Sequence, residues 1–437
     1  MIWWLVLSIL GAILAALFAT GMPVAIAFLG TNIVGAWMFL GGTAGLDQLV
    51  RNASGSVSSF SLVPIPLFIL MGELLFHCGL AYKAIEAVER LLNRLPARLA
   101  CVTVVGGTAF SALSGSSIAN TALLGSTLSQ EMMKRGYSTT LALGPAMATG
   151  GIAVLIPPST LAVMLGSLSG ISITQLLIGG IVPGFMMAAG FLIYVILVGI
   201  FDPTSSPRQN REQLYTFRER YVPFLRDVVP LFGIFVAVIG SMLSGIATPT
   251  EAAALGAVAA FFATIFYGKL SRAALQLALV ETAKVSISIL FIIVASTTFS
   301  QILSFSGATS GMLSLVQAVD PTPMSLVMSM LLILLLMGCF IDQVSMMMIT
   351  MPLFIPLAQS AGIDLVWLGL MMLVVIELGL LTPPFGMLLM VMQGAVKTVP
   401  LMQIYKAAIP FILIEIFVLG LMILWPDLTT FLPSLVR

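Results

Sequence analysis

The stretch VLIPPSTLAVML (154–165) places two adjacent prolines inside an apolar run, and LLTPPFGMLLMV (380–391) does the same 226 positions further along the chain. The same spacing relates Pro23 in GMPVAIAFLG to Pro249 in ATPTEAAALG. Matched Gly/Pro breaks in the two halves of a hydrophobic chain are typical of membrane proteins built from inverted repeats. The spacing therefore predicts two repeats of opposite orientation in the membrane.

The composition around these breaks excludes a water-soluble fold. Of the 437 residues, 59% are hydrophobic and only 8% are charged, against about 25% charged in soluble domains. At roughly 20 apolar residues per crossing, the apolar runs leave room for about ten or more helices. We therefore expect an all-α polytopic membrane protein in the lipid bilayer. The net charge of +1 argues against a nucleic acid partner, which calls for a basic surface.

The two repeats are expected at 1–201 and 227–437, joined by a polar linker at 202–226 that contains five arginines. Under the positive-inside rule this linker is cytoplasmic. The inverted topology then leaves only Arg51 and Arg437 outside. The basic residues predicted to be cytoplasmic are Lys83, Arg90, Arg94, Arg98, Lys134, Arg135, Arg208, Arg211, Arg218, Arg220, Arg226, Lys269, Arg272, Lys284, Lys397 and Lys406.

Apolar runs predict the order of the helices in each half. In the first half they lie near 2–20, 24–40, 61–78, 99–113, 117–133, 139–168 and 175–200. An amphipathic stretch at 81–98 is expected to lie along the membrane interface. In the second half the helices lie near 228–246, 250–267, 280–303, 309–318, in a pair meeting near 340, at 365–393 and up to about 425.

Two of these segments are expected to be re-entrant hairpins. The segments on either side of SALSGSSIAN (111–120) are too short to be two full spans, and the counterpart in the second half turns at GCFIDQ (338–343). Non-helical backbone at membrane depth is tolerated only where it lines protein or a water-filled cavity.

The Pro-Pro pairs are expected to leave backbone carbonyls without partners, because proline lacks an N–H. The carbonyls concerned belong to Ala153, Val154, Gly379 and Leu380. A bound cation is one way to satisfy them, since coupling ions bind at discontinuous helices in secondary transporters. The alternative is a plain proline kink satisfied by neighbouring helices or water.

The first hairpin offers Ser114, Gly115, Ser116, Ser117 and Asn120, whose oxygen atoms suit a hard monovalent cation. It has no thiol or imidazole that would suit zinc. Sodium therefore fits best. The alternative is that the serines are small packing residues between helices.

Asp342 in the second hairpin occupies the position of Ser116 under the 226-residue spacing. A carboxylate at membrane depth needs a cation, a proton or a hydrogen-bond donor. Asp342 could therefore bind an ion, or it could cap the helix beginning near Gln343.

Other ionisable residues give weaker signals. Glu73 and His77 share a helical face but have no third ligand in view. Glu377 and Glu415 are functional candidates because they lie within predicted spans, whereas Glu251 could cap the helix after Pro249. Three isolated cysteines and 27 methionines indicate packing rather than a metal centre. No constellation of nucleophile, base and metal indicates an enzyme.

Together, SALSGSSIANTALLGS, GGIAVLIPPSTLAVMLGS, ATPTEAAALGA and LGLLTPPFGMLLMV resemble the large membrane subunit of tripartite ATP-independent periplasmic (TRAP) transporters. The resemblance covers essentially the whole chain. It implies an elevator-type secondary transporter of the bacterial inner membrane, driven by a sodium gradient (Na+ as coupling ion). It also implies two partners, a small membrane subunit and a periplasmic substrate-binding protein that delivers a small organic anion. Because Met1 leads directly into the first span, the small subunit is expected to be a separate chain.

In this family the ion sites lie at the hairpin tips and the facing helix breaks. Carried over to this chain, the resemblance implies substrate-binding residues Ser116, Ser117, Asn120, Ser159 and Thr382. It implies that the metal ligands are Ser114, Gly115, Ser116, Ala153, Val154, Gly338, Asp342, Gly379, Leu380 and Thr382.

The substrate is expected to be a dicarboxylate, keto acid or sugar acid. The rival predictions are a stand-alone sodium/carboxylate symporter and an ion channel, neither of which uses a binding protein. A channel would need a continuous polar pore, whereas paired dead-end hairpins favour occluded sites.

Overall fold

The fold is known from a computed structural model that describes residues 3–93, 95–207 and 216–435. Within these residues it contains helices and no strand, as expected for an all-α protein. The helices of the first half are α1 (Trp3–Ala19), α2 (Val24–Phe39), α3 (Thr43–Val57), α4 (Pro64–His77), α5 (Leu80–Leu91), α6 (Arg98–Ser114), α7 (Ser117–Leu124), α8 (Gln130–Lys134), α9 (Thr139–Ile152), α10 (Thr160–Ser169), α11 (Ile173–Gly179) and α12 (Ile181–Phe201).

The second half begins with the linker helix and continues to the C-terminal end. Its helices are α13 (Phe217–Pro223), α14 (Val229–Leu243), α15 (Pro249–Phe266), α16 (Arg272–Phe305), α17 (Ala308–Val319), α18 (Pro323–Gly338), α19 (Gln343–Ser360), α20 (Leu365–Leu381), α21 (Met387–Ala395), α22 (Leu401–Leu424) and α23 (Asp427–Ser434). A 3-10 turn at Phe60–Leu62 precedes α4, and π-helical segments at Gly125–Ser129 and Phe224–Val228 extend α7 and α13.

Helix starts recur at the spacing seen in the sequence. Helix α7 begins at Ser117 and α19 at Gln343, while α9 begins at Thr139 and α20 at Leu365, so that both pairs are 226 positions apart. The long helix α16 stands where the first half has α3 and α4. The opposite orientation of the two halves in the membrane stays a prediction.

Two differences from the predicted helices have a physical reason. Helix α3 is absent from the predicted spans because Asp47, Gln48, Arg51 and Asn52 interrupt its apolar pattern. Helix α16 begins eight residues earlier than the predicted span at 280–303, because Arg272 and Gln276 interrupt the apolar run of its first two turns. The interfacial position expected for 81–98 stays a prediction; its helix, α5, covers only the first part of that stretch.

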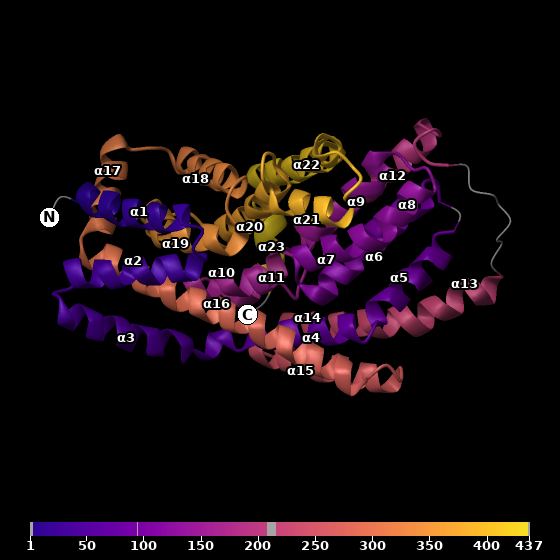
Figure 1. Cartoon of the computed structure of the whole chain (residues 1–437), viewed down its shortest axis with the longest axis horizontal. Helices are drawn as coiled ribbons and strands as arrows, with labels where there is room; N and C mark the ends of the chain where they lie inside the picture. Colours follow the sequence, from indigo (N-terminus) through magenta and orange to yellow (C-terminus); the bar gives the residue numbers. More distant parts are fainter. Residues whose placement is uncertain (1–2, 94, 208–215, 436–437) are drawn as a thin grey trace.

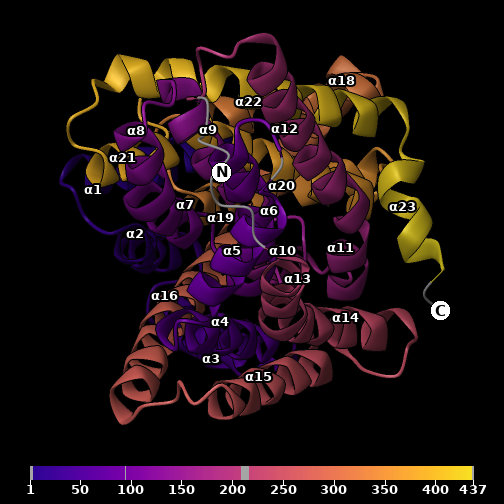
Figure 2. The same cartoon turned by 90° about the vertical axis from the view of Figure 1, so that its right-hand side faces the viewer.

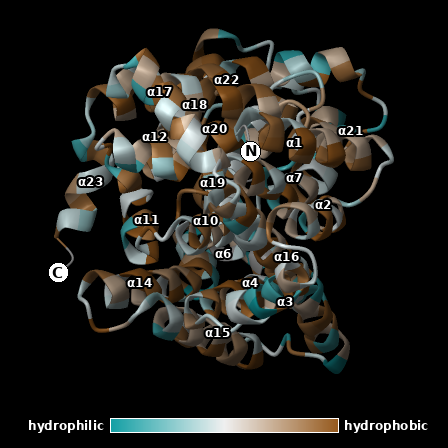
Figure 3. Ribbon diagram, turned by 90° about the vertical axis from the view of Figure 1, so that its left-hand side faces the viewer, coloured by the Kyte–Doolittle hydropathy of each residue, from teal (hydrophilic) through white to brown (hydrophobic). Residues whose placement is uncertain are grey.

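The helices form two layers, with α6, α7 and α19 between them (Figure 2). Helices α3, α4, α14, α15 and α16 make up the lower layer, and α12, α18, α20 and α22 lie in the upper one (Figures 2 and 3). Helix α16 runs along the lower side of the molecule for much of its length (Figure 1). It packs against both α2 and α4, which ties the N-terminal helices to the lower layer.

The centre of the upper layer is tightly packed. Every residue of α9 from Leu141 and of α20 from Trp367 is buried, because both helices are apolar on all sides and have neighbours all round. Large apolar side chains on the outer helices are exposed instead, as for Phe266, Ile287 and Phe417, and Figure 3 shows outer helices that are largely hydrophobic. Such a surface fits lipid.

Within the described residues, six helical stretches are long and apolar enough to cross a membrane. They are Phe60–His77, Ile173–Phe201, Phe217–Leu243, Pro249–Phe266, Arg272–Phe305 and Leu401–Leu424. The number is lower than the ten or so expected, because the helices at the hairpins and breaks are short: α9 has 14 residues and α10 has 10.

The linker is held against the first half by one of its arginines. Arg220 donates to the carbonyl of Leu91 at the end of α5, through Nε at 2.9 Å and also through a second guanidinium nitrogen. Arg94, Arg208 and Arg211, three of the residues predicted to be cytoplasmic, lie outside the described residues.

Candidate ion and substrate site at two hairpin tips

The first hairpin turns at a glycine that allows the backbone to reverse. Gly115 follows α6 with φ of +60°, a conformation that favours glycine. Ser116 then caps α7, because its Oγ accepts the N–H of Ala119 at 3.3 Å. Ser114 Oγ accepts the N–H of Ser116 at 3.4 Å. The tip therefore gathers serine oxygens around the start of α7.

This tip contacts the break between α9 and α10. A Cβ atom on Gly115 would lie 2.5 Å from the carbonyl oxygen of Pro158, so a larger residue would not fit. Thr160 Oγ1 donates to the carbonyl of Gly115 at 3.2 Å. Ser159, fully buried, caps α10 by accepting the N–H of Ala162 at 3.2 Å. The Pro157-Pro158 peptide bond is cis.

Asn120 anchors α7 to its neighbours. Its Nδ2 donates to Ser111 Oγ at 2.7 Å and to the carbonyl of Gly107 at 3.3 Å, while Ser111 Oγ donates to the carbonyl of Thr149 on α9 at 2.5 Å. The side-chain oxygen of Asn120 and the hydroxyl of Ser117 are buried without a hydrogen-bond partner. Both are therefore available to a ligand.

The second hairpin turns at Asp342, which caps α19. Its Oδ1 accepts the N–H groups of Val344 at 3.0 Å and Ser345 at 3.1 Å, and the hydroxyl of Ser345 donates to Oδ2. The predicted cap is therefore observed. Because a carboxylate oxygen has more than one lone pair, the cap is compatible with an ion at Asp342, and that role stays a prediction.

The second tip also contacts its break. A Cβ atom on Gly338 would lie 2.6 Å from the Cα of Gly379, which shows that α18 and α20 touch through backbone. The rings of Phe340 and Phe385 lie 5.8 Å apart across the same gap. Thr382 Oγ1 donates to the carbonyl of Leu378 at 2.7 Å. The Pro383-Pro384 bond is cis.

One of the carbonyls predicted to be free is not. The carbonyl of Gly379 accepts the N–H of Thr382 at 3.1 Å, because the end of α20 tightens by one residue. The prediction of a free carbonyl at Gly379 was therefore wrong. Ala153, Val154 and Leu380 receive no bond from Pro157, Pro158 and Pro384, which lack an N–H.

The oxygen atoms at both tips suit a sodium ion. The available donors are hydroxyl, carboxylate and carbonyl oxygens, which hard cations prefer. Each tip supplies a cap residue, Ser116 or Asp342, and each facing break supplies at least one carbonyl that its prolines leave without a helical partner. These oxygens would hold the ion and place its positive charge next to the start of α7 or α19.

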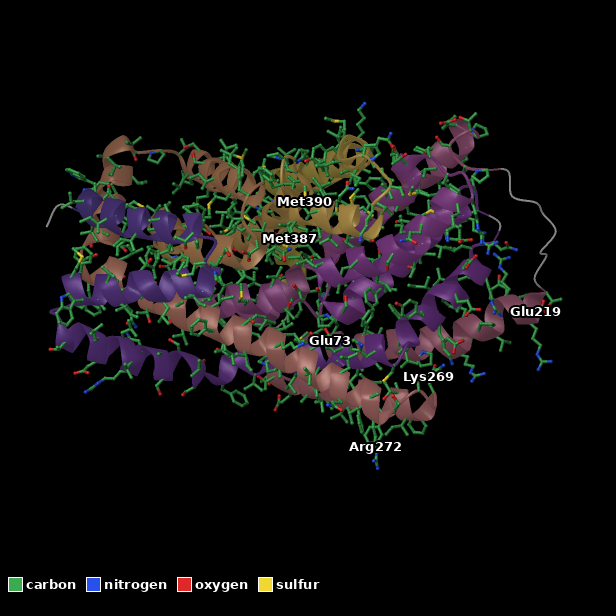
Figure 4. The ribbon with its side chains drawn as sticks, in the orientation of Figure 1. Glu73, Glu219, Lys269, Arg272, Met387 and Met390 are labelled. Atoms are coloured by element: carbon green, nitrogen blue, oxygen red, sulfur yellow. The ribbon has the colours of Figure 1, made fainter. Side chains whose placement is uncertain are left out.

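Two other predicted features lie apart from the tips. Glu73 Oε2 is 3.0 Å from His77 Nε2 on α4, in the lower layer and away from Met387 on α21 (Figure 4). Glu251 completes a capping box with Thr248, as its position next to Pro249 indicated. The cysteines are free and buried.

A cleft of about 390 Å3 lies between the lower layer and the end of α10. Hydroxyls of Ser61, Ser167, Thr174 and Thr250 line it, and none of the predicted site residues does. The first tip is mostly closed, since Ser117, Asn120 and Ser159 are buried, whereas Phe340 and Phe385 at the second tip are exposed. A substrate could reach these three residues only after the packing around them opens.

Glu377 and Glu415, which the sequence indicated only as separate candidates, lie together beside the tips. Gln343, the first residue of α19, donates to Glu377 Oε2. The signal that could have found this arrangement is the 226-residue spacing, which pairs Ser117 with Gln343 and Gly151 with Glu377.

Two packed layers, paired hairpins and two broken helices define a membrane transport protein of the secondary type. Residues 12–428 match the family model described as "Tripartite ATP-independent periplasmic transporter, DctM component". The chain belongs to this family. Its members are permeases of the inner membrane and not enzymes, and they act together with a small membrane subunit and a periplasmic binding protein.

Curated relatives span almost the whole chain. The 2,3-diketo-L-gulonate TRAP transporter large permease protein YiaN of Escherichia coli is 30% identical, with 97% of each chain covered. The sialic acid permease SiaM of Vibrio cholerae is 28% identical, again with 97% of each covered. The C4-dicarboxylate permease DctM of Pseudomonas aeruginosa is 30% identical, with 86% of each covered.

A solved structure shares the fold. The Alcanivorax borkumensis YdaH transporter aligns with a TM-score of 0.60, covering 88% of this chain and 89% of that one. The sequence identity is 14%, so the likeness concerns architecture alone.

Proposed function

We propose that this chain carries out sodium-coupled uptake of a small organic anion that a periplasmic binding protein delivers. The substrate class is a dicarboxylate, keto acid or sugar acid. Relatives named for 2,3-diketo-L-gulonate, sialic acid and C4-dicarboxylates support this class. A separate small membrane subunit completes the transporter.

The observation that carries the proposal is the contact of each hairpin tip with its own helix break. Gly115 meets Pro158 at the first, and Gly338 meets Gly379 at the second. Both places combine oxygen donors with a helix N-terminus, and neither the tips nor the Pro-Pro pairs contain Lys or Arg. A cation fits there directly, whereas an anion needs the helix N-termini and the bound cations.

Sodium can drive transport because binding of the anion depends on the bound cations. Sodium binding at the tips adds positive charge at the starts of α7 and α19, which favours the substrate carboxylate. We propose that the hairpins and broken helices then move as one body against the lower layer, as in an elevator. The long packed helix α16 would remain with that layer.

Uptake into proteoliposomes tests the function. Vesicles that contain this chain, the small subunit and an external substrate-loaded binding protein should accumulate substrate only with an inward sodium gradient. Accumulation without sodium would refute coupling. Equal accumulation without the binding protein would favour the stand-alone symporter, and passive equilibration without accumulation would favour the channel.

A further inference from the structure

Two buried glutamates from different helices face the same point on α9. Glu377 of α20 and Glu415 of α22 are each only 2% exposed. A Cβ atom on Gly151 would lie 3.2 Å from Glu415 Oε1 and 3.8 Å from Glu377 Oε1, so these oxygens are within about 7 Å of each other. The missing side chain at Gly151 therefore leaves the space that the two carboxyl groups share.

Several oxygens in this space have no hydrogen-bond partner. They are Glu377 Oε1, both carboxyl oxygens of Glu415 and the hydroxyl of Ser117. The Ser117 side chain, 3% exposed, lies close enough to interact with the Glu377 carboxyl group. Among the described residues, neither glutamate forms an ion pair with Lys, Arg or His.

The surroundings offset part of the negative charge. Ser117 is the first residue of α7 and Gln343 is the first residue of α19, and a helix N-terminus carries roughly half a positive charge. Gln343 also donates to Glu377 Oε2. Two ionised carboxyl groups would still leave about one negative charge, and a buried charge without a partner is strongly unfavourable.

We propose that Glu377, Glu415 and Ser117 bind one sodium ion, at a site that borders the two hairpin tips and differs from the expected tip sites in its two glutamate ligands. Four free oxygens are fewer than the six to eight that calcium requires, and a divalent ion would leave about one positive charge in excess. One monovalent positive charge also balances the remaining negative charge. Only the role of this ion in transport rests on the function proposed above.

The two repeats form one copy of this site and not two. Under the 226-residue spacing Ser117 corresponds to Gln343 and Gly151 to Glu377, so the two halves contribute different groups to one place. The ion would connect α7 and α9 of the first half with α19, α20 and α22 of the second. It would thereby hold both hairpins together as one body.

Binding of radioactive 22Na+ to the purified full-length protein tests the site. We expect Glu415→Gln to lose one sodium per chain or to bind it at least tenfold more weakly, because the variant keeps the shape and removes the charge. Glu251→Gln is the matched control. It removes a carboxylate in a capping box where glutamine also serves, and should bind sodium as the wild type does.

A second variant changes the space and keeps every charge. Gly151→Ala places a Cβ 2.9 Å from Glu377 Cγ, so sodium should bind several-fold more weakly. Wild-type affinity and stoichiometry in both variants, with a sodium lost in Asp342→Asn, would overturn this site and leave the proposed function standing. A wild type that binds no sodium would overturn both. A Glu415→Gln variant that loses a bound proton and no sodium would also overturn the site.

Discussion

At the scale of single residues, Asp342 caps α19 and places a carboxyl group at the start of that helix. Its Oδ1 atom receives two backbone N–H groups, and asparagine caps helices about as well as aspartate. Replacing the aspartate by asparagine therefore separates the carboxylate from the cap.

We expect Asp342→Asn to fold and insert but to need at least tenfold more sodium for half-maximal uptake, because the ion loses a charged ligand. The dependence of uptake on sodium concentration measures this. Ser345→Ala is the control: it removes the hydroxyl that donates to Oδ2 and keeps the charge, so it should stay close to wild type. An unchanged sodium dependence in Asp342→Asn would leave the cap as the only role.

At the scale of elements, α9 and α22 pack without room for another carbon atom. A Cβ on Gly144 would lie 2.7 Å from the carbonyl oxygen of Ala407 and closer still to the ring of Phe411. Since backbone cannot yield as a side chain does, this contact fixes the distance between the two helices.

Gly144→Ala should destabilise the protein by about 1–3 kcal/mol, the usual penalty for overpacking, and lower the midpoint of thermal unfolding in detergent. The comparison is Gly240→Ala on α14, where a Cβ meets nothing within 4 Å. That change should be neutral or stabilising by about 0.5–1 kcal/mol. Equal midpoints for the two variants would contradict the tight contact between α9 and α22.

At the scale of the whole molecule, the orientation of the two halves can be tested at the linker. A cysteine at Ser205 should resist an impermeant thiol reagent added to intact spheroplasts, because 202–226 is predicted to be cytoplasmic. A cysteine at the exposed Ser244, between α14 and α15, should react. The native cysteines are buried and give a low background. Labelling at Ser205 from outside would overturn the inverted topology.

Substrate binding by the whole membrane complex should also depend on sodium. Because the tips and breaks contain no basic side chain, we expect affinity for the substrate to fall at least tenfold when choline replaces sodium. Equilibrium binding to the purified membrane complex measures it. Equal affinity in the two salts would mean that the anion is held by groups other than the proposed cations.

The sequence predicted what depends on local pattern and spacing. The Pro-Pro breaks, the hairpin turns within 111–120 and 338–343 and most of the helix order follow from proline, glycine and apolar periodicity. It did not predict α3, whose polar residues hide its period, or the helical bond that occupies the carbonyl of Gly379. It also left Glu377 and Glu415 apart, because their proximity depends on how α20 and α22 pack across 38 positions of sequence.

The length of α16 has a consequence for the surrounding lipid. At 1.5 Å per residue, the apolar part from Val285 to Phe305 spans about 31 Å, close to the roughly 30 Å of bilayer hydrocarbon. The charged part from Arg272 to Lys284 would project about 20 Å beyond it. The ammonium group of Lys284 therefore marks the level at which α16 leaves the hydrocarbon of the bilayer. A bilayer of longer-chain lipids would have to thin locally or draw that charge inward, so each ångström of mismatch would cost free energy.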